Sequence, residues 1–488
     1  MTRSSLLLAL AGTTLLAGCN LAPTYVRPAG AVPATLPQGG IYPPAATDAP
    51  DVSAIGWRDF FTEDRLRQVI ARGLENNRDL RVAAANVLQA RERYRIQRAE
   101  QVPSTGLSGS ATYTNNAFGA GGAGGAGGAA GGVGTGVGAG VGTTSSNLEF
   151  YSLTAGFSAF ELDLFGRVRN LSRAALQQYF ATEEARRATR ISLIAEIATA
   201  WLTLASDQDQ LRLSRDTLRA FEQTRTLTQA QFRVGVASEL EARQADTNYQ
   251  AARNDIAVAE TRIARDRNAL DLLVGAPVPV ELLPAGLGEG QATLTALPTG
   301  LSSAVLLRRP DVLQAEHRLI AENANIGAAR AALFPNISLT ASLGTISSAL
   351  TGLFGAGGFI YSAAPGITLP LFDGGAARSN VRLSEATRQG AVATYERTIQ
   401  VAFREVADAL AQRGTIAEQV AAQSARAESA LVASRLSDAR YRVGVTNFIT
   451  ALDAQRTAYA AQQQLVTTRL TRANNLVELY RSLGGGLN

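Results

Sequence analysis

The chain has 488 residues, of which 46 are basic, all of them Arg, and 41 are acidic, for a net charge of +5. A single Cys and a single His exclude an intramolecular disulfide and a zinc site built from several Cys and His ligands. The Arg residues alternate with Glu and Asp and form no basic run, which argues against nucleic-acid binding. His317, the only candidate for imidazole catalysis, has no nucleophile motif nearby, so we expect no enzyme and no catalytic residues.

The N-terminus has the pattern of a targeting segment rather than of part of the fold. Arg3 precedes an apolar stretch, Leu6 to Ala17, that is too short to cross a bilayer as a helix. The stretch leads into Ala17-Gly18-Cys19, which resembles the bacterial lipobox, where the Cys is acylated and becomes the mature N-terminus. An ordinary signal peptide with a chance Cys is the alternative. We predict a lipoprotein signal peptide over 1–18, a lipid on Cys19 as the only bound group, with no metal or other cofactor, and an extended N-terminal arm over 19–61.

Two windows, residues 101–148 and 331–372, contain no charged side chain, although charges are frequent elsewhere. Apolar and small polar residues alternate within the windows and directly after the first one, for example from Ile337 through Leu343 and from Tyr151 through Ala159. One lipid-compatible face and one small polar face are typical of membrane β-strands of about nine to eleven residues. A soluble hairpin with one wet face is the alternative, but such a face usually carries charge. The windows predict four strands, near 104–118, 148–163, 336–346 and 359–372.

Four strands cannot close a barrel by themselves. The edge of an open sheet cannot lie in hydrocarbon, because each unpaired backbone group costs several kcal/mol there. The edges must therefore pair with other copies of the chain. Two copies would give eight strands and a filled interior, whereas three would give twelve strands around an aqueous lumen. We favour three copies, a homotrimer.

Long helical segments follow each pair of strands. Residues 171–232 contain neither Pro nor Gly, and apolar residues recur every seven positions at Ile197, Leu204 and Leu211. This spacing predicts a coiled-coil seam. Helices much longer than 25 residues are unusual in a compact domain. The fold class expected is therefore an α+β membrane protein, in which a trimeric twelve-stranded barrel is continuous with a long α-helical coiled-coil tunnel. The expected helices span 62–101, 171–232, 237–274, 303–333, 376–441 and 446–482.

The chain contains an internal duplication. Val102-Pro103 corresponds to Phe334-Pro335 at an offset of 232 (335 − 103), and Leu164-Phe165 corresponds to Leu371-Phe372. Further on, Gly235 corresponds to Gly444 at an offset of 209 (444 − 235). A Gly-rich insertion over 119–142 of the first copy accounts for the difference between the two offsets. Such a stretch buries too little surface to order itself. We expect repeat 1 over 62–274, an equatorial linker over 275–300, repeat 2 over 301–482 and a tail over 483–488.

Several motifs together resemble the outer-membrane efflux protein family, TolC/OprM-like and NodT-type lipoproteins. They are the lipobox and four internal stretches: Glu161-Leu162-Asp163-Leu164-Phe165-Gly166-Arg167, Arg309-Pro310-Asp311-Val312, Pro370-Leu371-Phe372-Asp373-Gly374-Gly375 and Tyr441-Arg442-Val443-Gly444-Val445. The resemblance implies a trimer in the outer membrane with a periplasmic extension. It also implies the exit duct of a tripartite efflux system, coupled through a periplasmic adaptor to an inner-membrane resistance-nodulation-division transporter. A type I protein secretion duct and a coiled-coil scaffold without a pore are the alternatives.

The resemblance also implies where the duct is closed. Ile449, Asp453 and Arg456 fall on one face of a helix, and the family's constriction residues correspond to Asp453 and Arg456 with Ile449 as an apolar plug. In a trimer, Asp453 would form a ring of three carboxylates. An ordinary surface ion pair between Asp453 and Arg456 is the alternative. Repeat 1 has Leu240, Gln244 and Thr247 at the equivalent places.

Two turns between long helices lie at the far tips of the predicted tunnel. Gly235 and Gly444 suit the unusual backbone angles of such turns. By resemblance, these tips contact the adaptor. The tip residues are Arg233, Val234, Gly235, Val236, Arg442, Val443, Gly444 and Val445.

Overall fold

The computed structural model describes residues 20–43, 55–116, 146–288, 293 and 302–485. The predicted signal peptide, the predicted anchor Cys19 and the Gly-rich stretch 119–142 lie outside these residues. The chain forms two compact units. The first consists of Met1–Thr24, Arg93–Ala175 and Asn323–Ala386, and the second of Tyr25–Glu92, Leu176–Glu322 and Thr387–Asn488. Each unit takes segments from both repeats, so the duplication does not divide the chain into two domains.

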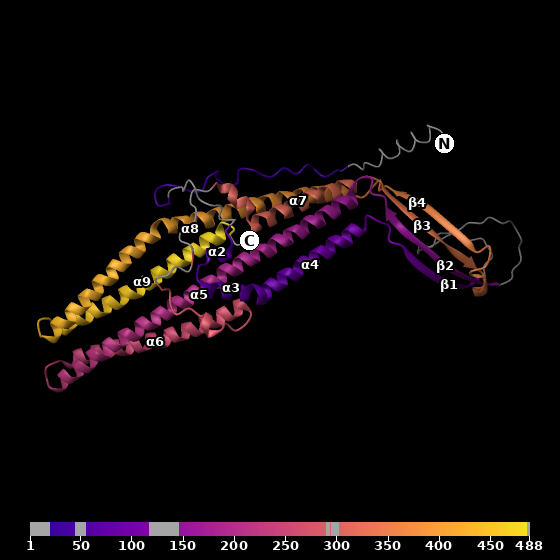
Figure 1. Ribbon diagram of the computed structural model, residues 1–488. Coiled ribbons are helices and arrows are strands. Elements are labelled where there is room, and N and C mark those ends of the chain that lie inside the picture. The colour runs from indigo at the N-terminus through magenta and orange to yellow at the C-terminus, as the bar shows by residue number, and fades with distance from the viewer. Residues whose placement is uncertain (1–19, 44–54, 117–145, 289–292, 294–301, 486–488) are drawn as a thin grey trace. The chain divides into compact units, whose positions relative to one another are not determined.

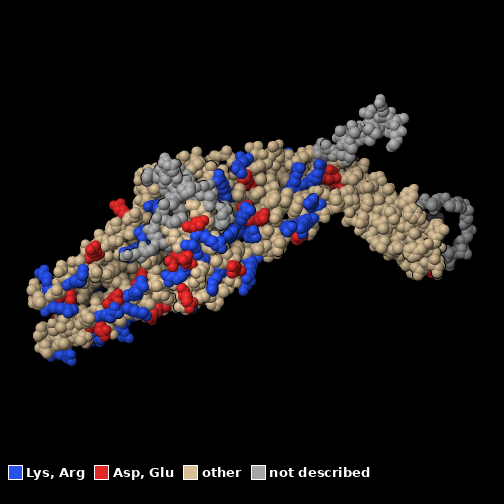
Figure 2. All heavy atoms as spheres, in the orientation of Figure 1, with Lys and Arg blue, Asp and Glu red and all other residues tan. Residues whose placement is uncertain are grey.

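The first unit contains one antiparallel sheet of four strands (Figure 1). In spatial order these are β1 (Gly106–Asn116), β2 (Ser146–Glu161), β3 (Asn336–Ser347) and β4 (Phe359–Thr368). Strand β2 of repeat 1 pairs with β3 of repeat 2, which leaves β1 and β4 as the edges. On the face visible in Figure 2 the sheet shows almost no charged atoms, whereas charges are frequent over the helices. A sheet of this composition suits a lipid environment once its edges are paired.

A β-bulge in β2 changes which side chains share the apolar face. The register between β2 and β3 shifts between Phe157 and Phe160. Ala159 lies in the bulge with φ of 52°, and its N–H donates a hydrogen bond to Thr340 Oγ1 at 3.0 Å. The alternation predicted through Ala159 is therefore wrong at its end. The bulge turns Phe160 to the side of Phe157, and the two rings meet edge to face at 6.3 Å.

Four long helices form two hairpins. Helix α5 (Arg167–Arg233) is followed by α6 (Glu239–Val274), and α8 (Ala376–Arg442) by α9 (Phe448–Ser482). One stretch of α5 is long and apolar enough to cross a membrane, but 56% of it is buried inside the protein, as in an ordinary core helix. The shorter helices are α2 (Trp57–Phe60), α3 (Asp64–Asn76), α4 (Arg78–Ala99) and α7 (Pro310–Ala331), with 3-10 turns η2 (Val280–Leu282), η3 (Ser303–Arg308) and η4 (Leu350–Gly352).

Asn77 and Arg309 interrupt the helices expected over 62–101 and 303–333, so the prediction of one continuous helix is wrong in both repeats. Asn77 has non-helical backbone angles between α3 and α4, with ψ of 133°, and its Oδ1 accepts from the Leu80 N–H at 2.8 Å. That bond caps α4. Arg309, with extended backbone angles, separates η3 from α7. The two residues are equivalent in the duplication, at an offset of 232 (309 − 77).

The core of the second unit gathers around three aromatic residues near the N-terminus. Trp57, Phe60 and Phe61 are at most 1% exposed. Phe60 stacks on Tyr480 of α9 with ring centroids 4.0 Å apart, and the Tyr480 hydroxyl donates to Ile55 O at 2.8 Å. The extended arm predicted over 19–61 is therefore wrong at its end, because the last residues form α2 and fill the core. Burying large aromatic side chains is among the strongest stabilising contributions in a fold.

The extended arm proper, residues 20–43, is held at several points along the chain. Arg27 forms two hydrogen bonds with the carboxylate of Glu316, Nε–Oε1 at 2.7 Å and Nη2–Oε2 at 2.8 Å. Glu316 also accepts from the Tyr25 hydroxyl at 3.0 Å and is only 6% exposed. Further along, Ser303 Oγ donates to Pro33 O at 2.6 Å. The carboxylate is buried but fully paired, so the arm has a fixed path.

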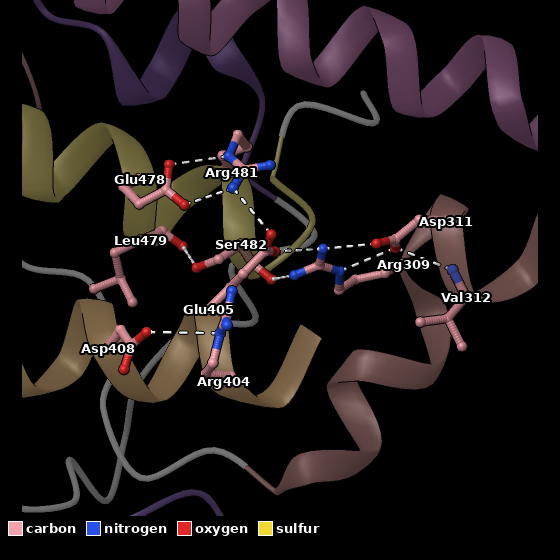
Figure 3. A network of polar contacts seen from close by, with 10 residues as sticks. All are labelled: Arg309, Asp311, Val312, Arg404, Glu405, Asp408, Glu478, Leu479, Arg481 and Ser482. Carbon is pink, nitrogen blue, oxygen red and sulfur yellow. Dashed lines mark hydrogen bonds and ion pairs between the residues drawn. The ribbon is translucent and has the colours of Figure 1, made fainter. Parts of the chain in front are cut away.

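An ion-pair network connects η3 and α7 with the two C-terminal helices (Figure 3). Arg309 Nη2 contacts Asp311 Oδ2 at 2.7 Å and Glu405 Oε2 at 2.8 Å. Arg481 approaches the same Glu405 at 3.4 Å and Glu478 at 2.6 Å. Burial alone lowers the pKa of Arg309, but the neighbouring carboxylates of Asp311 and Glu405 more than offset it, and the guanidinium stays charged.

Candidate functional site

Both turns between long helices have the same backbone. Gly235 has φ of 79° and Gly444 has φ of 78°, in the left-handed region that suits Gly. In the first turn the Gly235 N–H donates to Phe232 O at 3.0 Å, and in the second the Gly444 N–H donates to Tyr441 O at 2.9 Å. The glycines thus end α5 and α8.

The helices that leave the turns are capped at equivalent places. Ser238 and Glu241 form a capping box at the start of α6. Asn447 Oδ1 accepts from the Thr450 N–H at 2.9 Å at the start of α9. Between these ends, four Val side chains point into solvent and are 62–75% exposed: Val234, Val236, Val443 and Val445. Exposed apolar side chains on a rigid turn make a surface suited to a partner.

A row of polar contacts fixes α9 against the first hairpin. Gln455 Nε2 donates a hydrogen bond to Thr224 Oγ1 of α5 at 3.3 Å. One turn on, the Tyr459 hydroxyl contacts Ser214 Oγ of α5 at 2.9 Å and donates to Asp255 Oδ2 of α6 at 3.0 Å. Burial, with the nearby Asp255 carboxylate, raises the pKa of Tyr459 to about 12. This side of α9 is therefore occupied.

An apolar cluster continues the same contact toward the tips. Phe448 and Leu452 of α9 pack with Ala245 of α6, and Tyr441 of α8 covers them. The Tyr441 hydroxyl also donates to Gln231 Oε1 of α5 at 2.8 Å. The two hairpins are thus joined close to their turns, through contacts between α9 and α6 and between α8 and α5.

The candidate gate residues lie on the free side of α9. Ile449 is 57% exposed, and Asp453 and Arg456 are exposed, whereas Leu452 between them is 7% exposed. Among the described residues, neither Asp453 nor Arg456 has an ion-pair partner. The surface ion pair between the two, which the sequence left open, is therefore not formed. All three side chains are available to a lumen or to a neighbouring copy.

Repeat 1 presents a different set of groups at the equivalent level. Leu240 is 62% exposed and takes the place of Ile449. Gln244 and Thr247, which take the places of Asp453 and Arg456, carry no charge. Among the compared positions of the two hairpins, Asp453 is therefore the only acidic one.

Sequence reasoning missed Gln455 and Tyr459, which hold α9 in place. Their signal was visible: a Tyr and a Gln four residues apart in an Ala-rich helix fall on one face. His317 has a structural contact, because its Nδ1 lies 2.7 Å from Gln177 Oε1 and its ring lies against Phe180. Burial lowers its pKa. Within the described part of the chain, no three His, Cys, Asp or Glu residues group as they would around a metal ion.

Comparison with known proteins identifies the family. The family model described as outer membrane efflux protein matches residues 69–276 and 301–485, one segment in each repeat. The chain belongs to the outer membrane efflux protein family. It is 42% identical over 489 residues to the probable efflux pump outer membrane protein TtgC of Pseudomonas putida, covering 100% of this chain and 96% of TtgC. It is 37% identical over 476 residues to the cation efflux system protein CusC of Escherichia coli, covering 96% and 97%.

Solved structures of outer-membrane efflux channels share the fold. The open state of the MtrE outer membrane channel of Neisseria gonorrhoeae superposes with a TM-score of 0.83 at 34% identity, covering 96% of this chain and 99% of MtrE. A crystal structure of CusC gives a TM-score of 0.82 at 36% identity, covering 96% and 100%. The predicted fold class, a trimeric barrel continuous with a helical tunnel, is confirmed. So is the predicted role, an outer-membrane exit duct for efflux with a periplasmic extension.

Proposed function

We propose that this efflux duct is a passive channel, without catalysis, that is closed at its periplasmic end by Ile449, Asp453 and Arg456 of three copies. The exposure of these residues on the free side of α9 carries the proposal, because the opposite side is buried at Ala451 and Ala458 and the adjoining side is occupied by Tyr459 and Leu452. Three-fold symmetry places three Asp453 carboxylates and three Arg456 guanidinium groups around one axis. Ile449, one turn nearer the tip, adds an apolar ring.

The charges explain how such a constriction both closes and opens. Three like charges repel, so the Asp453 ring holds together only while cations or Arg456 side chains of adjacent copies neutralise it. A small change in the spacing of the helices breaks these contacts and widens the opening. Until then the carboxylates favour cations over anions. The names of the relatives include toluene, solvent, antibiotic and cation efflux. This range supports a duct that does not itself choose the substrate.

We further propose that the exposed Val residues of the two tip turns, with Arg233 and Arg442 beside them, bind the periplasmic adaptor, which joins the duct to an inner-membrane resistance-nodulation-division transporter. This proposal is supported by the exposure of apolar side chains on turns whose following helices are capped. We also propose that the lipid on Cys19 anchors the mature chain. The hydrogen bonds that hold residues 25–33 of the arm against Glu316 and Ser303 support this proposal, because they keep the chain that follows the anchor in a fixed place.

Single-channel conductance in planar bilayers tests the gate. Asp453→Ala should raise conductance and reduce cation selectivity, whereas Asp408→Ala, which removes an exposed acid of α8, should change neither. Gln244→Asp adds a second ring of three carboxylates and should increase cation selectivity. If conductance and selectivity stay the same in both Asp453→Ala and Gln244→Asp, then α9 does not line the constriction.

A further inference from the structure

The segment between β4 and α8 exposes two large apolar side chains. Leu371 is 91% exposed and Phe372 is 93% exposed. Asp373, the next residue, accepts hydrogen bonds from the Gly375 N–H at 2.8 Å and the Ala377 N–H at 2.7 Å. The start of α8 is therefore capped, and Phe372 stands immediately before a fixed point of the backbone. Its exposure calls for a partner outside the chain.

The duplication shows what such a residue contacts. Leu164-Phe165, between β2 and α5, correspond to Leu371-Phe372. Phe165 is half-buried, and its ring stacks on Phe334 with centroids 4.7 Å apart and planes inclined by 18°. Phe334 lies where α7 of repeat 2 passes into β3. The strand-to-helix segment of one repeat therefore packs on the helix-to-strand segment of the next.

Within one chain this contact can be made only once. The residue equivalent to Phe334 is Val102, at an offset of 232 (334 − 102), and it is 61% exposed. The helix before it, α4, has no buried residue, whereas its counterpart α7 buries Val312, Leu319 and Ala331 to 4% exposure or less. The helix-to-strand segment of repeat 2 thus packs on the strand-to-helix segment of repeat 1. The helix-to-strand segment of repeat 1 has no such partner within the chain, because no repeat precedes it among the described residues.

The free residues lie at the two open edges of the sheet. Phe372 follows the edge strand β4, and Val102 precedes the edge strand β1. In a closed barrel β4 of one copy meets β1 of the next, antiparallel as in the β2–β3 pair. That pairing brings the end of β4 beside the beginning of β1. Phe372 and Val102 would therefore lie next to each other and extend the interface between β4 of one copy and β1 of the next.

We propose that Phe372 of one copy packs on Val102 and the end of α4 of the next copy, and so repeats between subunits the stack of Phe165 on Phe334. The interface is head to tail, so three copies close into a ring. The inference rests on the trimer of the proposed function but specifies a contact that the trimer alone does not. A lipid surface is the other apolar partner available to Phe372, and the test separates the two.

Two variant chains, Val102→Cys and Phe372→Cys, each with Cys19 retained for acylation and each with a different affinity tag, are co-expressed. They are treated in outer-membrane vesicles with a short bifunctional thiol reagent. The expected product is a dimer that carries both tags, while each variant alone stays monomeric in denaturing gels. The double variant Val102→Cys/Phe372→Cys should give products up to a covalent trimer and none larger. Phe165→Cys/Phe334→Cys is the matched pair within one chain and should lose both thiols without forming any dimer.

A second pair controls for proximity in the membrane. Tyr361 of β4 is 81% exposed but lies toward the other end of the strand, so Val102→Cys with Tyr361→Cys should give no dimer. The native mass of the uncrosslinked protein and its conductance report separately whether the trimeric channel has formed. An intact conducting trimer without the mixed dimer overturns the contact. So does strong quenching by brominated lipids of a fluorophore attached to the Phe372→Cys variant, which assigns this position to the lipid surface.

Discussion

Asn77 and Arg309 hold the same place in the two repeats, and each donates a hydrogen bond to a carbonyl that is also equivalent. Asn77 Nδ2 contacts Leu273 O at 2.8 Å, and Arg309 Nη1 contacts Ser482 O at 2.7 Å. The carbonyls are related by the offset of 209 (482 − 273). An amide and a guanidinium thus fill the same role at the ends of α6 and α9. Arg309 also binds Asp311 and Glu405, which Asn77 cannot imitate.

Replacing Arg309 should destabilise the second unit severely. Its side chain is 7% exposed, and its removal takes the short ion pairs from Asp311 and Glu405 and leaves Glu405 only the longer contact with Arg481, at a cost of roughly 3 kcal/mol. Arg309→Met should therefore lower the thermal midpoint of the detergent-solubilised protein, and Arg309→Met/Glu405→Met should recover part of the loss. Arg404→Ala serves as the control, because its contact with Asp408 is long, at 3.9 Å, and exposed. Equal midpoints for Arg309→Met and Arg404→Ala would contradict this account.

The glycines that end α6 and α9 should differ in their tolerance of a side chain. Gly275 and Gly484 have φ of 77° and 78°, so Ala at either place costs about 1–2 kcal/mol of backbone strain. A Cβ on Gly275 would also lie 2.6 Å from Asn76 O, whereas on Gly484 its nearest neighbour is Arg309 Cγ at 3.5 Å. Gly275→Ala should therefore lower the thermal midpoint more than Gly484→Ala does. The reverse order would show that the close approach of Gly275 to Asn76 is relieved by a backbone shift.

The first hairpin should become less stable as pH rises through about 6. Burial, together with Asp207 of α5, raises the pKa of Asp266 on α6 to about 6 from 3.8, against an opposing effect of Arg262. A folded-state pKa above the unfolded value means that the proton stabilises the folded state. That stabilisation is complete below about pH 4 and is lost as pH rises through 6. Hydrogen exchange of α6 should be slower at pH 5 than at pH 7.5, after correction for the intrinsic rates.

Asp266→Asn provides the matched control for this titration. The amide can bond to Asp207 without a second charge, so the variant should show similar protection of α6 at both pH values. Asp216→Asn, which changes an exposed acid of α5 paired with Arg219, should keep the dependence of the parent. A variant Asp266→Asn with unchanged pH dependence would assign the titration to another group.

Charges introduced at the tips should weaken adaptor binding without closing the channel. Val443→Asp and Val234→Asp each place a carboxylate where an apolar side chain is more than 70% exposed, so folding should be unaffected. Co-purification with the periplasmic adaptor of the same organism should fall several-fold, while conductance in bilayers stays at the parent value. Val26→Asp, on the arm, is an equally exposed control and should bind normally. Unchanged co-purification of both tip variants would place the adaptor elsewhere.

The sequence was sufficient to predict the strands because two local signals mark them, the absence of charge and the alternation of apolar and small polar side chains. An uncharged window with alternating side chains needs no knowledge of distant residues, and the helices between the windows carry long coiled-coil spacings. The duplication showed each element a second time. The turns at Gly235 and Gly444 could be predicted because a Gly between two long helical stretches marks the point where the chain reverses.

What the sequence hid depends on contacts between distant segments. Asn77 breaks a helix because its side chain finds Leu273 O, 196 residues away, and no local pattern reveals that partner. Trp57 belongs to the core only because other helices surround it. The bulge at Ala159 is set by Thr340 on another strand. In the candidate gate, spacing alone placed three side chains on one face, but only the contacts of Tyr459 and Leu452 show that this face is free.

A trimer of a duplicated chain has six similar hairpins but only three copies of every mutation. In a true hexamer, an acid introduced at the level of Asp453 would appear six times and crowd the axis with charge. Here Gln244 keeps alternate positions neutral. At the proposed gate, a duplicated chain thus allows the repulsion to be set in steps of three, which an assembly of identical single repeats does not.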